Sequence, residues 1–134
     1  MLPAASRLGR VHHVGVACRA IEPVRSWVHA THEVTHDSGV VHDPAQRADL
    51  CLLSLADGGA IELVAGEAVS SLVKRGHSYY HLCHEVDDLE TTIGGLEPSG
   101  CRLVSPPTPA VLFGGRPVAF LLSPTGLVEL LEAR

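Results

Sequence analysis

Short apolar stretches of strand length are separated along the chain by turns rich in glycine, proline and aspartate. Val11–Cys18 alternates and is rich in valine, as expected for a strand whose two faces differ. The Asp57-Gly58-Gly59 turn leads directly into another apolar run, as in a hairpin. The predicted strands are Val11–Cys18, Glu33–Val41, Asp49–Leu55, Ala60–Ala65, Tyr79–Val86, Cys101–Val104, Pro117–Leu122 and Leu127–Leu131.

Two stretches have helical periodicity instead. The first has Pro23 in its opening turn, and the second follows a cap at Asp87 or Asp88, although Gly94 and Gly95 weaken it. Positions three or four apart define the inward face of each helix. In the first helix they are Val24, Trp27, Val28 and Thr31, and in the second Leu89, Ile93 and Leu96.

Two connecting segments differ in character. Val69, Leu72 and Val73 predict a short linking helix that ends at Gly76. The stretch Ser105–Gly115 is rich in proline and glycine, which predicts an irregular loop.

The order strand, helix, three strands occurs twice, and the two copies share anchor residues. His13 and His81 each lie in an opening strand and are 68 residues apart. Glu62 and Glu129 each lie in a closing strand and are 67 residues apart. We therefore predict an α+β fold of two tandem βαβββ modules in one domain spanning 1–134. Module one covers about 10–66, the linker about 67–77 and module two about 78–132.

The repeated glutamates interrupt strands that otherwise contain buried residue types. Glu62 stands between Ile61 and Leu63, and Glu129 has equally apolar neighbours. A carboxylate buried without a partner costs several kcal/mol, so one such residue would be expected to face solvent. Two of them, each with a histidine about 48 residues upstream, indicate a shared task instead.

Two imidazoles and two carboxylates form a ligand set suited to a divalent ion. Zn²⁺, Co²⁺, Ni²⁺, Mn²⁺ and Fe²⁺ all accept nitrogen and oxygen ligands. Four protein ligands on a six-coordinate ion leave two positions for substrate oxygens. The predicted ligands are His13, Glu62, His81 and Glu129, in a catalytic and not a closed structural site.

Composition narrows the choice of partner and compartment. The net charge is −5 and the ten Lys and Arg residues are scattered, which disfavours nucleic acid and anionic membranes as partners. No apolar run is long enough to cross a membrane, and Met1–Arg10 does not resemble a signal peptide. We expect a cytoplasmic protein whose four cysteines, without CxxC spacing, are buried thiols.

Three segments carry a family resemblance that spans Val11–Glu132. They are His13-Val14-Gly15-Val16-Ala17, His81-Leu82-Cys83-His84-Glu85-Val86-Asp87-Asp88-Leu89, and Gly115-Arg116-Pro117-Val118-Ala119-Phe120-Leu121 continuing to Gly126-Leu127-Val128-Glu129-Leu130. The chain resembles the vicinal oxygen chelate (glyoxalase/bleomycin resistance/dioxygenase) superfamily, and most of all its methylmalonyl-CoA epimerase branch.

This resemblance implies a curved, partly closed mixed sheet around a central metal cleft, with the same four ligands. It also implies a homodimer that acts on a small molecule such as an acyl-CoA or a carrier-protein thioester. The expected reaction is epimerisation or isomerisation by proton abstraction next to the thioester carbonyl. Residues expected to line the substrate are Gln46, Tyr79, Cys83 and Arg116, whereas His12 and His84 are expected on the opposite face.

The chain departs from the epimerase pattern at the base. Epimerases of this family carry a glutamate where this sequence has Gln46, and an amide cannot accept the proton. We therefore predict that Glu129 or Glu62 is the catalytic base. Glyoxalase I-type lyase chemistry and iron-dependent oxygenation are alternatives. A non-catalytic binder of the antibiotic-resistance type is an alternative of another class.

Overall fold

The two sequence repeats fold into two units of the same kind, in a computed structural model that describes all 134 residues. One unit is His13–Tyr80, and the other combines Met1–His12 with His81–Arg134. Each contains strands, a helix against one sheet face and further strands, which confirms the predicted α+β class. These units divide between His12 and His13 and between Tyr80 and His81, and the module bounds given above stay a prediction.

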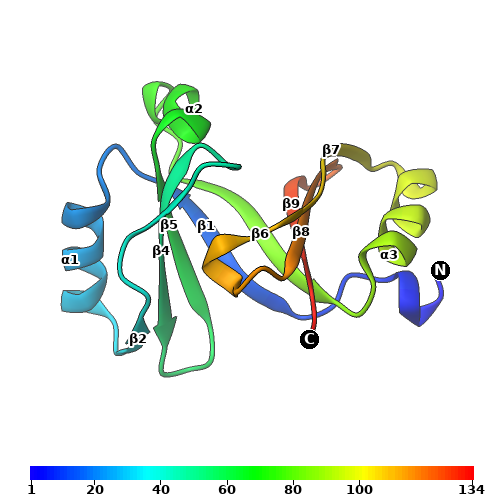
Figure 1. Cartoon of the computed structure of the whole chain (residues 1–134), viewed down its shortest axis with the longest axis horizontal. Coiled ribbons are helices and arrows are strands. Elements are labelled where there is room, and N and C mark those ends of the chain that lie inside the picture. The colour runs from blue at the N-terminus through cyan, green and yellow to red at the C-terminus, as the bar shows by residue number, and fades with distance from the viewer. The chain divides into compact units, whose positions relative to one another are not determined.

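The first unit has one long helix and a mixed sheet (Figure 1). Its sheet pairs β1 with β5 in parallel, β5 with β4 antiparallel, and β4 with both β2 and β3 antiparallel. The elements are β1 (Val11–Ala17), α1 (Ile21–Thr31), β2 (Val34–Asp37), β3 (Val41–Asp43), β4 (Ala48–Leu55), β5 (Ala60–Ala65), η2 (Glu67–Val69) and α2 (Ser70–Lys74).

The second unit repeats this pattern of pairing. In its sheet β6 and β9 are parallel, while β9 with β8 and β8 with β7 are antiparallel. The elements are η1 (Ala4–Ser6), β6 (Tyr79–Val86), α3 (Leu89–Leu96), η3 (Glu97–Ser99), β7 (Arg102–Pro109), η4 (Val111–Phe113), β8 (Pro117–Ser123) and β9 (Gly126–Glu132).

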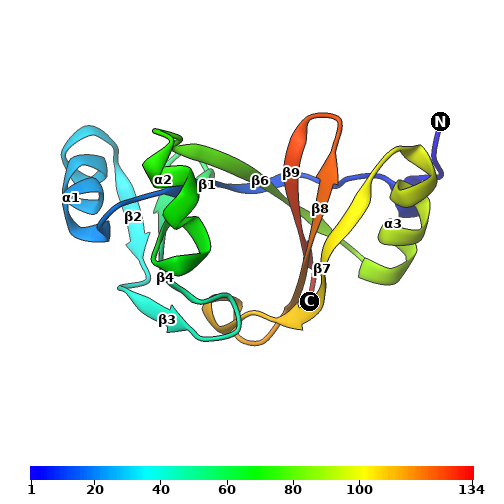
Figure 2. The same ribbon diagram turned by 90° about the horizontal axis from the view of Figure 1, so that it is seen from above.

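Each long helix covers one face of its own sheet. In the first unit Ile21 and Val28 of α1 pack with Leu53 and Leu63 of the sheet. In the second unit the apolar side of α3 packs against β8 and β9 (Figure 2). The side chain of Asp88 caps α3 by accepting a hydrogen bond from Thr91 N, as predicted. The opposite face of each sheet is not covered by the long helix of its unit.

Three local predictions were wrong. Trp27 is 60% exposed, so the buried stripe of α1 is narrower than its periodicity indicated. The predicted strand Glu33–Val41 is divided into β2 and β3, with Gly39 between them at a positive φ of 71°. Strand β7 continues to Pro109, through part of the predicted loop. It pairs only with β8, and its register shifts twice, which lets an edge strand hold prolines.

The other connections agree with the sequence. The linking helix α2 ends before Gly76, which has a positive φ of 76°. All four cysteines are free, and Cys18, Cys51 and Cys83 are buried. No helix of the structure has both the length and the apolar character needed to span a membrane.

An ionic cluster fixes α1 to β2. The Asp37 carboxylate accepts hydrogen bonds from Arg25 Nε at 2.7 Å and His29 Nε2 at 2.8 Å. Its other oxygen accepts bonds from Gly39 N and the Cys51 thiol. Burial alone would raise the pKa of Asp37, but these hydrogen bonds outweigh it and hold the pKa well below its ordinary value. Burial, with the adjoining Asp37, raises the pKa of Cys51 to about 11, so this thiol is unreactive at neutral pH.

The N-terminal segment runs beside β6 with little room. Glu85 N donates a hydrogen bond to Arg10 O at 3.0 Å, and His84 Nδ1 lies 2.8 Å from Gly9 O. A Cβ at Gly9 would fall on the main-chain carbonyl oxygen of Glu85. Glycine is therefore required at this position by the close approach of two backbones.

We predict that Gly9→Ala lowers the free energy of unfolding by about 2–3 kcal/mol, because the methyl group forces the two backbones apart. The matched control is Gly94→Ala in α3, where an added Cβ meets nothing within 4 Å. This control should raise stability by about 0.5–1 kcal/mol. Urea denaturation of both variants measures the difference, and equal effects would contradict the proposed crowding.

We also predict that Asp37 makes unfolding acid-dependent. Its folded pKa lies below the unfolded value, so its contribution is complete above about pH 4 and is lost as the pH falls towards the folded pKa. The Asp37→Asn protein should be less stable than wild type at pH 7, with a smaller difference at pH 3. Parallel urea titrations at the two pH values test this. A difference that does not shrink on acidification would contradict the ionic role.

Candidate metal centre and active site

His13 and Glu62 form a buried pair on the face of the first sheet that is opposite to α1. Strands β1 and β5 are parallel, with Gly15 paired to Glu62. Side chains two residues apart in a strand share a face, so His13 lies diagonally beside Glu62. The His13 Nε2 to Glu62 Oε1 distance is 3.6 Å. The exposed fractions of the two residues are 1% and 3%.

His81 and Glu129 form the corresponding pair in the second unit. In the parallel pairing of β6 with β9, Cys83 is the partner of Glu129, and His81 precedes Cys83 by two residues. The His81 Nε2 to Glu129 Oε1 distance is 3.1 Å, and both side chains are buried. The register therefore repeats that of the first unit position by position.

The geometry of each pair fits two neighbouring positions around a divalent ion. Ligands bound at about 2.1 Å on an octahedral or tetrahedral ion are about 2.9–3.4 Å from each other. The Nε2 to Oε1 distances in the two pairs, 3.6 and 3.1 Å, are close to this spacing. Imidazole nitrogen and carboxylate oxygen are also ligand types that such ions accept. The residues that are present thus fit a metal.

Burial of Glu62 and Glu129 lowers the stability of the fold, because their carboxylates lose contact with water. Glu62 has Leu63 and Val64 next to it, and Glu129 precedes Leu130 and Leu131; all four apolar residues are at most 2% exposed. Desolvating an ionised carboxylate costs several kcal/mol even when a partner is near, so well-packed apolar residues would stabilise the fold at least as well. Such groups are more often kept for chemistry than for stability.

An aromatic ring fixes the orientation of His81. Phe120 of β8 is paired with Glu129 and contacts the His81 ring edge-to-face, with centroids 5.5 Å apart. Edge-to-face contacts of this kind are favourable and directional. Sequence reasoning did not single out Phe120, although its alternation with Ala119 and Leu121 on β8 placed it on the ligand face.

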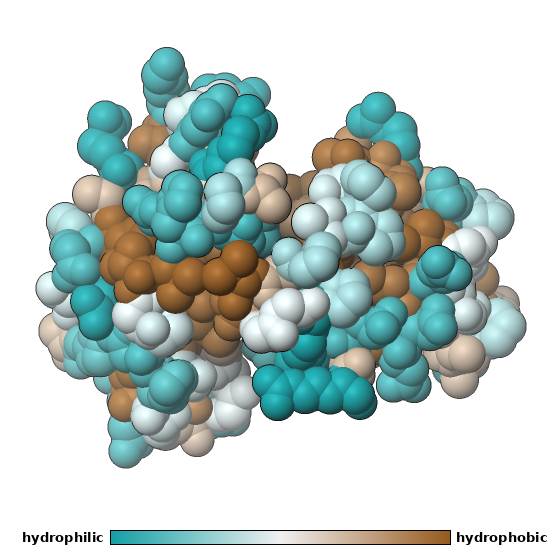
Figure 3. Space-filling view, in the orientation of Figure 1, coloured by the Kyte–Doolittle hydropathy of each residue, from teal (hydrophilic) through white to brown (hydrophobic).

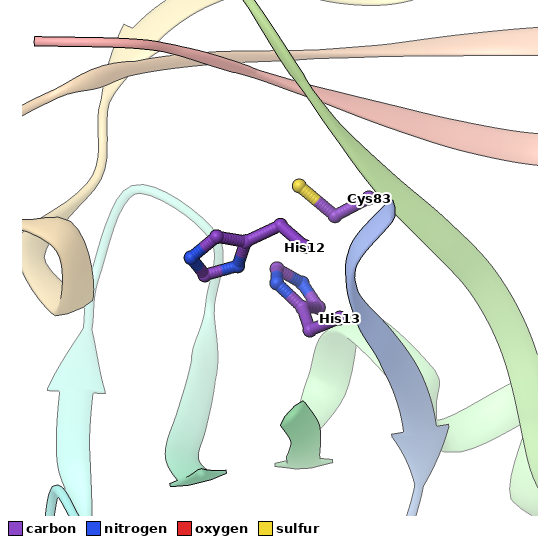
Figure 4. Close-up of side chains that lie close together, drawn as sticks. All are labelled: His12, His13 and Cys83. Atoms are coloured by element: carbon purple, nitrogen blue, oxygen red, sulfur yellow. The ribbon is translucent and has the colours of Figure 1, made fainter. Parts of the chain in front are cut away.

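Cys83 and His12 lie beside each other in the second unit. Figure 4 shows the Cys83 side chain leaving β6 close to the His12 ring. Cys83 is fully buried, and Phe113 meets the His12 ring edge-to-face at a centroid distance of 5.4 Å. The role of Cys83 as a substrate-lining residue stays a prediction. His84, which was expected on the other face, lies against the carbonyl oxygen of Gly9.

The other predicted substrate-lining residues are in different environments. Tyr79 is 76% exposed at the start of β6. Arg116 donates hydrogen bonds to Glu85 Oε2 at 2.8 Å and to Glu132 O at 3.0 Å, which ties its guanidinium to two strands. The hydrogen bond from Arg116, assisted by Arg10, lowers the pKa of Glu85 despite partial burial. Contact of Tyr79 and Arg116 with a substrate stays a prediction. The hydrogen bonds of Arg116 also give this residue a structural role.

Asp43 is a buried acidic residue that the sequence analysis missed. It is 0% exposed and pairs with Ala48, and residues 48, 50 and 52 of β4 alternate onto the face that carries Glu62. Its carboxylate accepts hydrogen bonds from Ala45 N, Gln46 N and Gln46 Nε2. Asp43 therefore fixes both the backbone and the side-chain amide of Gln46, the predicted substrate-lining residue. The Asp-Pro sequence at the start of a turn was the available signal.

Comparison with protein families decides the relationship. The model of the Glyoxalase/Bleomycin resistance protein/Dioxygenase superfamily matches residues 12–120, which is most of the chain. The chain belongs to this superfamily. The comparison with curated proteins found no match to this chain.

Solved structures of the same fold include epimerases. Methylmalonyl-CoA epimerase from Mycobacterium tuberculosis is 23% identical, with a TM-score of 0.79, over 100% of this chain and 93% of that one. A Streptomyces coelicolor methylmalonyl-CoA epimerase variant in complex with 2-nitronate-propionyl-CoA is 24% identical, with a TM-score of 0.70, over 95% and 99%. A hypothetical protein from Bacillus halodurans C-125 is 23% identical, with a TM-score of 0.75, over 93% and 94%. Likeness at this identity establishes the fold.

We predict that Asp43→Ala lowers the free energy of unfolding by about 2–4 kcal/mol, because it removes the acceptor of three hydrogen bonds inside the protein. Asp57→Ala is the control, since Asp57 accepts a similar bond from Gly59 N in an exposed turn. The control should cost less than about 1 kcal/mol. Urea denaturation compares the two variants, and a similar loss in both would argue against a special role of the buried carboxylate.

Proposed function

We propose that this chain is a metal-dependent enzyme of the superfamily that removes a proton next to the carbonyl of an acyl thioester, as in epimerisation. The observation that carries the proposal is the pair of buried His–Glu contacts in matching registers. His13 and Glu62 from one unit, with His81 and Glu129 from the other, would together hold one divalent ion. Zn²⁺, Co²⁺, Ni²⁺, Mn²⁺ and Fe²⁺ suit this ligand set.

Such an ion, when bound, supplies Lewis-acid stabilisation of the negative charge that develops on the substrate carbonyl. The protein must still provide a base within hydrogen-bond reach of the carbon-bound proton. We assign this role to Glu129 or Glu62, because Gln46 is an amide and cannot accept a proton. The apolar residues around each glutamate limit the water at the site, which strengthens the electrostatic interactions of the carboxylate there.

The acyl thioester is supported by the structural neighbours. Several of them are methylmalonyl-CoA epimerases, and one was solved with methylmalonyl-CoA bound. The fold is shared along nearly the whole of both chains, which supports a substrate of the same class. The proposed enzyme works in the cytoplasm as a homodimer.

The experiment is hydrogen exchange at the substrate carbon. Metal-loaded protein is incubated with methylmalonyl-CoA in deuterated water, and deuterium incorporation is followed by mass spectrometry. We expect incorporation with wild type and a loss of at least about 100-fold with Glu129→Gln or Glu62→Gln, whichever carries the base. Gly94→Ala is the control, because its open position on α3 leaves both His–Glu pairs intact.

Other outcomes point to other members of the superfamily. Full exchange in both glutamine variants with metal retained would contradict the assignment of the base. No exchange with a panel of thioesters, but turnover of thiol adducts of α-ketoaldehydes, would favour a glyoxalase-type lyase. No turnover of either class, with tight ligand binding, would favour a non-catalytic binder.

A further inference from the structure

A small pocket lies in the first unit at the edge where the parallel strands β1 and β5 end. It is lined by the segments that follow these strands, Cys18–Arg19 and Gly66, and by one side of α2. Its volume is about 280 Å³. Whole small-molecule pockets are usually about 300–1,000 Å³, so this one has the size of a subsite.

Two cations line this pocket, and neither forms an ion pair. Arg19 and Lys74 are exposed and have no carboxylate partner in the structure. Two other arginines of the unit are paired, since Arg25 is bound by Asp37 and Glu22 and Arg47 by Glu67, whereas Arg75, next to Lys74, has no carboxylate partner either. Two unpaired cations at one pocket make its rim positively charged, although the net charge of the chain is −5.

The floor and the surroundings of the pocket suit a compact anion. Cys18 and the half-buried Val73 supply its apolar surface. Burial raises the pKa of the Cys18 thiol, so it adds no negative charge at neutral pH. The nearest acidic side chain in sequence, Glu67, is occupied by Arg47 at 2.8 Å. Figure 3 shows hydrophilic side chains gathered over the α2 end of this unit.

The pocket is a fixed distance along the strands from the first His–Glu pair. Arg19 follows His13 by six residues, the last two beyond the end of β1, and Gly66 follows Glu62 by four residues. At about 3.3 Å per extended residue, the pocket lies at most about 13–20 Å from the pair. A ligand that reaches both needs a reacting group at one end and an anionic group at the other.

We propose that Arg19 and Lys74 bind a phosphate group of the thioester carrier. This inference rests on the proposed function, because it assigns the anionic end of the same substrate. Phosphate accepts charge-assisted hydrogen bonds from both guanidinium and ammonium groups. The phosphate occurs in coenzyme A and also in a phosphopantetheine arm, and the experiment separates these sources.

The test compares the double variant Arg19→Gln/Lys74→Gln with the matched control Arg102→Gln/Arg134→Gln. The control removes the same charge from exposed residues of the other unit. Binding of coenzyme A, 4′-phosphopantetheine and pantetheine is measured by calorimetry at constant ionic strength. We expect the pocket variant to lose at least about tenfold in affinity for coenzyme A and nothing for pantetheine, while the control keeps both. A parallel loss for 4′-phosphopantetheine would identify the phosphate of the arm, and retention would identify the nucleotide phosphates.

Two results would overturn the inference: unchanged coenzyme A affinity in the pocket variant, or an equal loss in the control. Because binding needs no turnover, a protein that shows the expected losses but no proton exchange would contradict only the proposed function. Conversely, a pocket variant that exchanges acyl-CoA as efficiently as wild type, at limiting substrate, would keep the function and remove this subsite.

Discussion

A carboxylate and an imidazole shielded from water in the same sheet face constitute the constraint on which this protein depends. The pairs His13–Glu62 and His81–Glu129 sit where apolar side chains would fold at least as well. The other buried residues of these strands are mostly leucine and valine, and they stabilise the fold against the desolvation of the two pairs. A fold that keeps this arrangement twice is organised around those groups.

The helices are placed accordingly. In each unit the long helix covers the face away from the His–Glu pair, and it supplies the apolar contacts that the other face cannot. The parallel pairing of the opening strand with the closing strand sets the register, so the histidine always falls two residues before the partner of the glutamate. Repetition of the strand pairing therefore also repeats the buried His–Glu pair.

The fold class and the family could be predicted from the sequence because the two halves of the chain repeat the same pattern, so each half supports the interpretation of the other. The same residue types at matching offsets predicted the repeated order of strands and helices and the family. The failures came where long-range contacts decide. Trp27 has the spacing of the apolar stripe, yet its ring is exposed and contacts His32 at the surface. Strand β7 holds prolines because an edge strand needs fewer hydrogen bonds. Asp43 was missed because its burial depends on the pairing of β3 with β4, which places Asp43 opposite the buried Ala48.

The most direct test of the account is the number of metal ions bound per chain. Metal-depleted protein is titrated with Co²⁺, and binding is followed by its d–d absorption and by elemental analysis after gel filtration. We expect one ion per chain, and loss of all binding in His13→Ala and in His81→Ala alike, because in the proposed centre both pairs would hold the same ion. Two ions per chain, or a variant that loses only half of its binding, would contradict the shared centre.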